Sequence, residues 1–563
     1  MNLTTPPNFA AALTRAAAEN PHWPVLTLLH AGQPDQTLTS ADLLAGAARY
    51  AAALAQSGAQ PGEVVVLILP HSRALVEAYW GTVLHGAVPS IMPFLTEKLL
   101  PERYRAELTA LAGLTTPAAV ITNGEFEPEV RAAFDAQAAA VLIVEALPAE
   151  APAIPETAWG GLSRAPQEIA LLQHSSGTTG LQKGVALSHG AVFRQLTAYA
   201  RAIHFTRDDV IVSWLPLYHD MGLIAGFLMP ILLGARLVLM SPFDWVRAPQ
   251  RLFQAVSQQR GTLTWLPNFA YNFCAQKIRD RHLEGVDLSS WRAVINCSEP
   301  TRHDSHRAFA ERFAAWGLNP AALGVCYAMA ENVFAVTQSG IDGPVNVDEI
   351  DRELFQTARR AEPVRPGAAA LKMLSAGRPL DNVELRIADV HNGTPLAERQ
   401  VGEVLLRSDC MLSGYYRRPE ETARALRGGW YHTGDLGYLA AGELYVSGRI
   451  KDLIIVGGKN IYPQDLEELA MQAPGVHPGR VSAFGVEDAG AGTEAVVVVA
   501  EVDSSDPAER EQIAAAVREV VTRGSAVALR RVHLVGPGWL VKTSSGKNNR
   551  LANREKFIHE VGL

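Results

Sequence analysis

The N-terminal part of this chain alternates short apolar runs with segments of helical periodicity, and this alternation limits the possible folds strongly. Apolar runs of strand length lie at Val64–Leu69, Val210–Trp214 and Ala293–Cys297, while Pro249–Gln259 and Ser305–Trp316 have the pattern of helices that connect such runs. Strands joined through helices pair in parallel, and the helices cover the faces of the sheet. The sequence therefore predicts an α/β fold, with a large N-terminal domain of helix-covered, mostly parallel sheets.

The pattern changes near Val383, where short strands follow one another across turns rich in Gly and Asp. This spacing predicts a small antiparallel, barrel-like subdomain at about residues 380–448. A boundary at Ser447–Asp452 precedes a last stretch of α+β pattern. At 563 residues the chain exceeds what one hydrophobic core supports. We expect an N-terminal domain over residues 1–448 and a small α+β C-terminal domain over residues 449–563.

Composition argues against a nucleic-acid-binding or membrane-spanning protein. Hydrophobic residues make up 48% of the chain and charged residues 19%, which is normal for globular proteins. The net charge of −8 supplies no basic field for nucleic acid. The apolar stretch Met221–Met240 is interrupted by Pro230 and Gly234 and contains Arg236. It is typical of a helix followed by a strand, not of a membrane span.

The cysteines and the first residues lead to two further expectations. The cysteines have no paired spacing, so neither a disulfide framework nor a zinc site is indicated; they are Cys274, Cys297, Cys326 and Cys410. The opening MNLTTPPNFA lacks the basic and apolar regions of a signal peptide. We therefore expect a cytoplasmic location.

A loop rich in hydroxyls and glycines separates two apolar runs at Ile169–Leu172 and Val185–Leu187. It ends in a cation, Lys183, and the other small residues are Ser175, Ser176, Gly177, Thr178, Thr179, Gly180 and Gly184. Short donors and close-approaching backbone amides are what phosphate oxygens require. The loop is not a Walker loop, because Gly184 follows Lys183 where that motif has Ser or Thr. A flexible surface loop is the alternative interpretation.

Four other polar clusters lie further along the chain. They are His219-Asp220 after an apolar run, Tyr327 with Glu331, Asp435 on a turn, and the loop Lys542–Lys547. His219 could equally cap the following helix or face a ligand at the carboxyl end of a parallel sheet. Each of the other clusters also has a purely structural interpretation. Together they supply phosphate donors, a stacking ring, a hydroxyl-binding acid and a cation, which suits a nucleoside triphosphate that reacts with an acid.

Six motifs in this order resemble those of the adenylate-forming superfamily. The superfamily includes acyl-CoA synthetases, peptide-synthetase adenylation domains, luciferases and fatty acyl-AMP ligases. The motifs are SSGTTGLQKG, PLYHDMG, YAMAE, WYHTGDLG, GRIKD and KTSSGK, and the resemblance extends from Leu38 to Arg550. One such motif is weak evidence, whereas six in order are strong evidence.

The resemblance implies roles for individual residues. Residues 175–184 would hold the phosphates of ATP, Glu331 with Thr178 or Thr179 would place Mg²⁺, and Lys547 would reach both the carboxylate and the α-phosphate. His219 joins Lys547 and Glu331 as a catalytic candidate. The adenine and ribose would lie against Tyr327, Ala328, Met329, Ser298, Glu299, Pro300, Asp435 and Arg449. No side-chain nucleophile is needed, because the carboxylate attacks the α-phosphorus and pyrophosphate leaves. Lys451 in GRIKD would be the hinge of a mobile C-terminal domain.

Three stretches resemble the fatty acyl-AMP ligase branch in particular: Leu266–Tyr271, Asn296–Thr301 and the long insertion Val345–Pro366. In that branch the insertion restricts the C-terminal domain, so that acyl-AMP passes to an acyl carrier protein thiol instead of CoA. A tolerated surface loop is the alternative for the insertion. An apolar pocket for a fatty acid would involve Leu223, Ile224, Asn268, Phe269 and Tyr271, although such residues could equally be plain core.

Two other functions remain open. The run Val456–Pro463 is closer to the corresponding motif of CoA ligases, which supports an acyl- or aryl-CoA ligase. A non-catalytic adenylate-binding protein is the alternative of another class, although Lys547, Glu331 and Asp435 are all present. Asn332 stands where a small residue or Thr is common and could alter the pocket.

Overall fold

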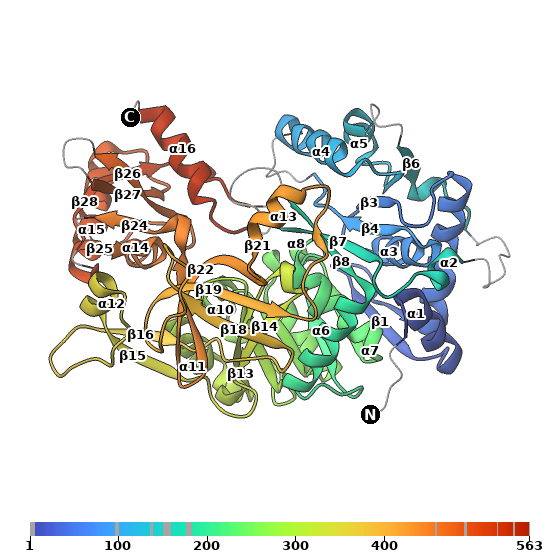
Figure 1. The fold of residues 1–563 in the computed structure, drawn as a ribbon, viewed down its shortest axis with the longest axis horizontal. Coiled ribbons are helices and arrows are strands. Elements are labelled where there is room, and N and C mark those ends of the chain that lie inside the picture. The colour runs from blue at the N-terminus through green and yellow to red at the C-terminus, as the bar shows by residue number, and fades with distance from the viewer. Residues whose placement is uncertain are drawn as a thin grey trace.

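A large domain carries the N-terminus and a smaller domain carries the C-terminus, and the two lie side by side (Figure 1). The computed structural model describes residues 6–95, 101–134, 139–149, 159–175, 183–456, 459–488, 493–525, 527–543 and 546–561. Within these residues, no helix combines the length and the apolar character that crossing a bilayer requires.

Nine strands form the main sheet of the large domain. In order across the sheet they are β17 (Arg378–Pro379), β14 (Ala335–Ser339), β13 (Leu323–Ala328), β12 (Ala293–Cys297), β11 (Leu263–Leu266), β9 (Val210–Ser213), β10 (Arg236–Met240), β1 (Pro24–Leu29) and β2 (Gln36–Thr39). The strands from β13 to β1 pair in parallel, whereas β14, β17 and β2 are antiparallel to their neighbours. The predicted parallel sheet is confirmed, and the antiparallel strands lie at its two edges.

Two smaller sheets complete the N-terminal half. The first is wholly parallel and consists of β4 (Val88–Ile91), β3 (Val64–Ile68), β5 (Ala119–Thr122) and β6 (Ala140–Ile143). The second is antiparallel and consists of β20 (Gly414–Tyr415), β8 (Lys183–Ser188) and β7 (Ile169–Ser175). Every residue of β3 is buried, which agrees with its unbroken apolar sequence and its central place between β4 and β5.

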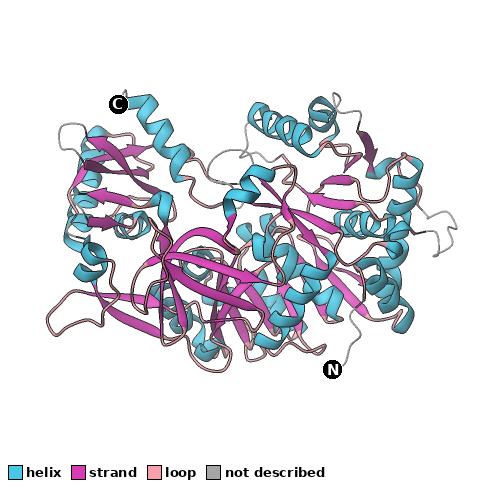
Figure 2. Cartoon of the chain, in the orientation of Figure 1, coloured by secondary structure: helices cyan, strands magenta, loops and turns pink. Residues whose placement is uncertain are grey.

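Helices flank the strands of the large domain, as Figure 2 shows in cyan and magenta. They are α1 (Phe9–Glu19), α2 (Ser40–Gln56), α3 (Arg73–His85), α4 (Pro101–Thr115), α5 (Glu127–Phe134), α6 (His189–Ala202), α7 (Met229–Leu233), α8 (Pro242–Arg247), α9 (Gln250–Gln259), α10 (Asn268–Lys277), α11 (His303–Phe313) and α13 (Pro419–Ala425). The hydroxyls of Thr39, Ser72 and Ser188 cap α2, α3 and α6. Side-chain acceptors of this kind satisfy the first N–H groups of a helix.

The stretch Met221–Met240 is a helix followed by a strand, as predicted. The helix begins as a π-helix at Met221–Leu228 and continues as α7 before β10. A side chain at Gly222 would place its Cβ 2.2 Å from the carbonyl oxygen of Pro216, so this position requires glycine. The sequence pattern did not indicate the π-helical turn, which is a rare element often found at functional sites.

The antiparallel subdomain has five strands: β18 (Val383–Ala388), β19 (Gly402–Ser408), β21 (Leu426–Arg427), β22 (Trp430–Ala440) and β23 (Glu443–Arg449). All of its pairings are antiparallel, as predicted. The predicted insertion Val345–Pro366 is ordered and contains β15 (Val347–Asp351) and α12 (Arg352–Ala358). Strand β15 pairs antiparallel with β16 (Ala370–Leu374), which follows the insertion.

The C-terminal domain has a three-stranded sheet, a hairpin and three helices. The sheet has β26 (Val481–Asp488), β27 (Thr493–Glu501) and β28 (Leu529–Val535), and the hairpin has β24 (Ile454–Val456) and β25 (Lys459–Ile461). The helices are α14 (Pro463–Ala470), α15 (Pro507–Ser525) and α16 (Arg550–Val561). Helix α16 was not predicted; it packs through Phe557, which is fully buried.

Candidate active site

The chain leaves β9, β12 and β13 at one edge of the main sheet, and the predicted polar residues follow these strands. His219 and Asp220 come after β9, Ser298 follows β12, and Glu331 comes after β13. Because the strands are parallel, their carboxyl ends share an edge, where ligands of such sheets bind. The fold therefore brings together segments that are far apart in the sequence.

The hydroxyl-rich loop connects β7 to β8. Ser176, Gly177, Thr178, Thr179 and Gly180 lie outside the described residues, as do residues 181 and 182. Ser175 ends β7 and pairs in register with Lys183, which begins β8. The ammonium of Lys183 lies 4.7 Å from the ring centroid of Tyr415, a cation–π contact.

A buried tyrosine holds the Glu331 carboxylate. The hydroxyl of Tyr415 donates to Oε1 of Glu331 at 2.7 Å, and the hydroxyls of Tyr415 and Tyr431 lie 3.0 Å apart. Burial and the nearby Glu331 carboxylate raise the pKa of Tyr431 well above its ordinary value, so its hydroxyl stays protonated and available as a donor. Since β20 pairs with β8, Tyr415 contacts both Lys183 and Glu331.

The oxygen of Glu331 is a suitable ligand for a hard cation such as Mg²⁺. Among the described residues no group of three or more His, Cys, Asp or Glu side chains could hold a metal ion. Mg²⁺ is commonly bound through one or two carboxylates, with phosphate oxygens and water as its other ligands. One carboxylate next to a phosphate-type loop fits that mode.

Asp435 links the main sheet to the antiparallel subdomain. The hydroxyl of Tyr327 donates to its Oδ2 at 2.6 Å, and Nε of Arg449 lies 2.9 Å from its Oδ1. The Asp435 charge raises the pKa of Arg449 above its usual value, so this guanidinium stays charged. A carboxylate has about four acceptor positions, so Asp435 retains capacity for ligand hydroxyls.

The segment after β12 adopts an unusual backbone. Ser298 has a φ of 69°, which is uncommon for a residue other than glycine. Oε2 of Glu299 accepts from the N–H of Phe269 at 2.9 Å at the start of α10. Glu299 thus has a structural partner, Pro300 follows it, and Ala328 and Met329 extend from the end of β13 toward Glu331.

His219 and Asp220 form a close pair, although they are adjacent in the sequence. Nδ1 of His219 lies 2.7 Å from Oδ1 of Asp220, and the N–H of Met221 donates to the same Oδ1 at 2.8 Å. Burial raises the pKa of Asp220, but His219 and the positive charge of Lys547 outweigh that effect and lower it. Lys547 belongs to the C-terminal domain, so its charge acts across the domain boundary on the site after β9.

The five predicted pocket residues differ in their surroundings. Leu223, Ile224 and Tyr271 are buried in the core, and the Tyr271 hydroxyl donates to the carbonyl oxygen of Val294. Asn268 holds α11, because its Nδ2 donates to Ser305. Phe269 is 40% exposed and meets the stacked rings of Trp214 and Trp245 edge-on.

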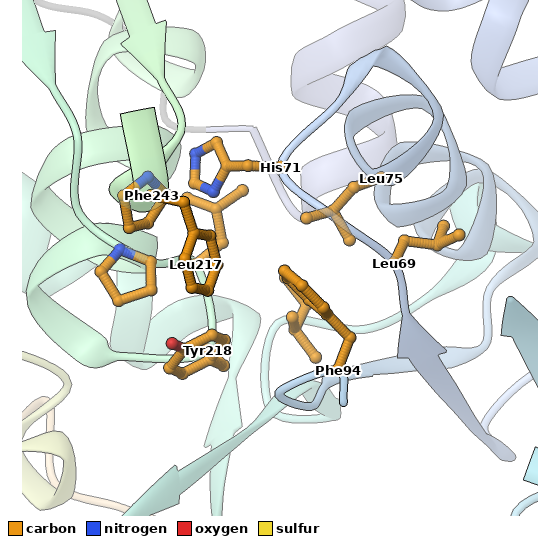
Figure 3. A pocket seen from close by; sticks show the side chains of 10 residues that line it. Leu69, His71, Leu75, Phe94, Leu217, Tyr218 and Phe243 are labelled. Atoms are coloured by element: carbon orange, nitrogen blue, oxygen red, sulfur yellow. The ribbon is translucent and has the colours of Figure 1, made fainter. Parts of the chain in front are cut away.

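A second apolar surface lies next to the His219 segment. Leu217 and Phe243 face Leu69, Leu75 and Phe94 across a narrow pocket (Figure 3). Burial lowers the pKa of His71 at one end of this pocket to about 4, so the imidazole is neutral. The sequence did not indicate this pocket, because its walls come from α3, β4, α8 and the loops after β3, β4 and β9, which are distant in the chain.

An arginine of the large domain binds the C-terminal domain near the site. The guanidinium of Arg302 lies 2.8 Å from Oδ1 of Asp465 and 3.3 Å from Oε2 of Glu468, both on α14. At the hinge, Arg550 contacts Asp452 at 2.9 Å and also Glu467 at 2.7 Å. The Arg302 pairs join the two domains, whereas both Arg550 pairs lie within the C-terminal domain. Burial lowers the pKa of Lys451, the predicted hinge residue, and the neighbouring Arg449 charge lowers it further.

The insertion also contacts the C-terminal domain. The guanidinium of Arg359 donates to Oδ1 of Asn460 at 3.0 Å, and Nδ2 of Asn460 donates to the carbonyl oxygen of Gln356 at 2.8 Å. The ring of Phe355 packs against that of Tyr462 at a centroid distance of 5.3 Å. In Figure 1, α12 lies directly beside β25 and α14.

The sequence analysis missed Tyr415, Arg302 and Asn460. Tyr415 and Arg302 lie outside the recognised motifs, and Asn460 was considered only as part of Val456–Pro463, for its resemblance to CoA ligases. The role of each depends on a contact with a distant segment. Tyr415 follows Gly414 in a short strand whose pairing with β8 brings it to Lys183. A Gly-Tyr pair just before a helix gives no indication of that pairing.

Comparison with known proteins agrees with this site. The AMP-binding enzyme family model matches residues 13–416. The long-chain-fatty-acid–AMP ligase FadD26 of Mycobacterium marinum is 30% identical over 93% of this chain and 91% of its own length. The medium-chain-fatty-acid–[acyl-carrier-protein] ligase JamA of Moorena producens is 32% identical over 69% of this chain and 68% of its own.

Solved structures agree as well. A structure from a study of the fatty acyl-adenylate ligases of E. coli and L. pneumophila superimposes with a TM-score of 0.90, at 31% identity over 99% of this chain and 98% of that one. The chain therefore belongs to the AMP-binding enzyme family. Within the adenylate-forming superfamily, it is most similar to the fatty acyl-AMP ligase branch.

Proposed function

We propose that this protein activates a fatty acid with ATP to form acyl-AMP and pyrophosphate, and then transfers the acyl group to the phosphopantetheine thiol of an acyl carrier protein in the cytoplasm. The main support is geometric: at the edge of the main sheet Tyr415 holds the Glu331 carboxylate, and Tyr327 and Arg449 hold the Asp435 carboxylate. In addition, the positive charge of Lys547 in the C-terminal domain contributes to the lowered pKa of Asp220 at this edge. The long-chain-fatty-acid–AMP ligase FadD26 of Mycobacterium marinum matches 93% of the chain and supports the same reaction.

In the first half-reaction the carboxylate attacks the α-phosphorus and pyrophosphate leaves, so one P–O bond forms and another breaks. Lys547 neutralises charge on both reacting groups, and preorganised charge of this kind is a large source of rate. Glu331 holds the metal–phosphate group, and Mg²⁺ supplies charge neutralisation of the phosphates. Lys183 and residues 175–180 bind the phosphates, while Tyr327, Asp435 and Arg449 hold the nucleoside. His219 orients the Asp220 carboxylate.

An apolar chain has two surfaces available beside His219. One is the exposed ring of Phe269, and the other is the narrow pocket between Leu217 and Phe94. The narrow pocket is lined by apolar side chains together with His71 and Tyr218. Burial lowers the pKa of His71 to about 4 and raises the pKa of Tyr218 to about 12, so both are neutral and neither favours a dicarboxylate. These surfaces support an unsubstituted fatty acid as the substrate.

The second half-reaction determines the acceptor. The carrier-protein thiol attacks the acyl carbonyl and AMP leaves, after the C-terminal domain turns about Lys451. Contacts of α12 with β25 support restricted rotation and therefore a carrier protein, through Arg359 and Asn460. The alternative, a CoA ligase, is favoured by the sequence of residues 456–463, which include the same β25.

A direct experiment separates these outcomes. The protein is incubated with ATP, Mg²⁺ and fatty acids of increasing chain length, and pyrophosphate release is measured. Holo-carrier protein or CoA is then added, and the thioester is measured by mass spectrometry. We expect acid-dependent pyrophosphate release and acyl-carrier-protein product. Efficient acyl-CoA formation would support the CoA ligase, and the absence of acid-dependent pyrophosphate release would refute the adenylation.

A further inference from the structure

The segment after Glu331 has a backbone conformation that β-branched residues rarely adopt. Val333 has a φ of 63° and a ψ of −55°. The N–H of Phe334 donates to the carbonyl oxygen of Asn332 at 2.7 Å. This geometry is a γ-turn of the rare, strained type, and valine is a poor residue for it. Val333 is also fully buried, so the turn is not a loose surface feature.

A buried polar cluster holds the turn through Asn332, whose side chain is fully buried. Its Nδ2 donates to the carbonyl oxygen of Ala335 at 2.7 Å and to Oε1 of Gln195 at 3.3 Å. Its Oδ1 accepts from the hydroxyl of Ser408 at 2.5 Å. The Asn332 amide thus ties the turn to α6 and to the end of β19. If Asn332 were replaced by a side chain without hydrogen-bond donors or acceptors, its buried partners would be left unpaired. Unpaired buried polar groups lower the stability of the folded protein.

Glu331 lies immediately before this cluster and is fixed on both sides. Its carbonyl oxygen accepts from the N–H of Leu412 at 2.8 Å, and its carboxylate accepts from Tyr415. The turn then directs the chain back, so that the N–H of Met329 donates to the carbonyl oxygen of Phe334 at 2.9 Å. A strained backbone conformation persists only where many surrounding contacts hold it in place, and such residues are concentrated at functional sites.

We propose that the strained turn at Val333 and the buried amide of Asn332 position the Glu331 carboxylate for the metal–phosphate group. Asn332 and Val333 are therefore positioning residues of the adenylation reaction. This inference rests on the proposed function, because it assumes that Glu331 binds the metal. It also differs from the sequence expectation that Asn332 alters the acid pocket, since Asn332 is directed into the core.

The test measures metal binding without acid, so it does not depend on turnover. Mn²⁺ is used in place of Mg²⁺. Because ATP binds Mn²⁺ in free solution, the binding of Mn²⁺–ATP to the protein is measured from the enhancement of water proton relaxation. Glu331→Gln shows how much Mn²⁺ binding is lost when the carboxylate is removed. We expect Asn332→Ala and Val333→Gly to weaken Mn²⁺ binding about tenfold, the usual effect of removing a group that orients a metal ligand.

Val336→Ala is the matched control, because Val336 is a fully buried valine in the ordinary strand β14. We expect it to lower the melting temperature without changing Mn²⁺ binding. Val333→Gly keeps the polar cluster and relieves the strain of the positive φ, but it also frees the backbone to leave the turn, so Mn²⁺ binding should weaken. Relief of strain offsets part of the lost burial, so its melting temperature is expected to fall by an amount similar to that of Val336→Ala. A fall in Mn²⁺ binding for Val333→Gly alone of these two variants is then not a result of misfolding.

The inference is overturned if Glu331→Gln loses Mn²⁺ binding while Asn332→Ala and Val333→Gly bind within twofold of the unmodified protein. Unchanged binding in Glu331→Gln removes the metal role of Glu331 and this inference with it. Failure of the proposed function has a different signature: Mn²⁺–ATP binding with the expected variant effects, but no acid-dependent pyrophosphate release.

Discussion

At the residue scale, His189 is a buried histidine that the fold keeps unprotonated. It begins α6, its Nδ1 accepts from the N–H of Phe9 at 3.3 Å, and its ring meets the Phe9 ring edge-on. Burial, with a smaller effect of Arg164, lowers the pKa of His189 to about 4. His174 and His306 are likewise buried and have a pKa of about 4. In the folded chain these imidazoles are therefore neutral.

This burial makes stability depend on pH. Between pH ~6.5, the pKa of an unfolded histidine, and pH ~4 the unfolded chain binds a proton that the folded chain rejects. Stability is therefore full above pH ~6.5 and falls as the pH drops, by up to about 1.4 kcal/mol per pH unit for each such histidine. His189→Asn keeps an acceptor for Phe9 but cannot titrate. We expect a shallower loss of stability from pH 7 to pH 5 in urea unfolding.

The exposed His22 provides the control, and His22→Asn should leave the pH dependence unchanged. Equal slopes for the unmodified protein and His189→Asn would contradict the buried, neutral state of His189.

Residue positions in the motifs could be predicted from sequence, but their partners could not. Ser188 as a helix cap follows from local chemistry, because the N–H of Ala191 that donates to its hydroxyl lies three residues away. The sequence indicated only that Asn332 could alter the pocket, whereas its partners Gln195 and Ser408 are supplied by distant segments. The direction of a side chain at such a position depends on tertiary packing, and the local sequence pattern carries no information about that packing.

At the scale of elements, the insertion is an ordered unit that binds the C-terminal domain. Its helix α12 contacts β25 through Arg359 and Asn460, and through the rings of Phe355 and Tyr462. The sequence predicted that the insertion exists but could not distinguish a loose surface loop from a docked helix. The difference lies in contacts with residues about a hundred positions away.

Loss of one of these contacts should release the C-terminal domain. Arg359→Ala removes the hydrogen bonds to Asn460 while leaving Phe355 in place. A hydrogen bond to a charged group contributes about 1.5 kcal/mol, so we expect roughly a tenfold rise in acyl-CoA formation relative to acyl-carrier-protein formation. The ratio is measured by mass spectrometry with both acceptors present.

Arg360→Ala is the matched control, because Arg360 is exposed and pairs with Glu362 inside the insertion. It should leave the ratio unchanged. An unchanged ratio in Arg359→Ala as well would show that this contact does not restrict the acceptor.

At the scale of the whole molecule, two domains share one site. The alternation of apolar runs predicted the parallel sheets, because strand and helix periods are local properties. The order of the motifs predicted which segments meet. The orientation of the C-terminal domain was not predictable, since it depends on ion pairs such as Arg302–Asp465 and on the charge of Lys547 at Asp220.

The central claim is that Lys547 completes a site built on the large domain, and one measurement tests it directly. Pyrophosphate release with ATP and a fatty acid is compared for the unmodified protein, Lys547→Ala and Lys542→Ala. Lys542 is in the same loop but donates to the carbonyl oxygen of Gly479 inside the C-terminal domain. We predict a loss of about a hundredfold or more for Lys547→Ala and near-normal release for Lys542→Ala. A rate for Lys547→Ala within a few-fold of the unmodified protein would contradict the account.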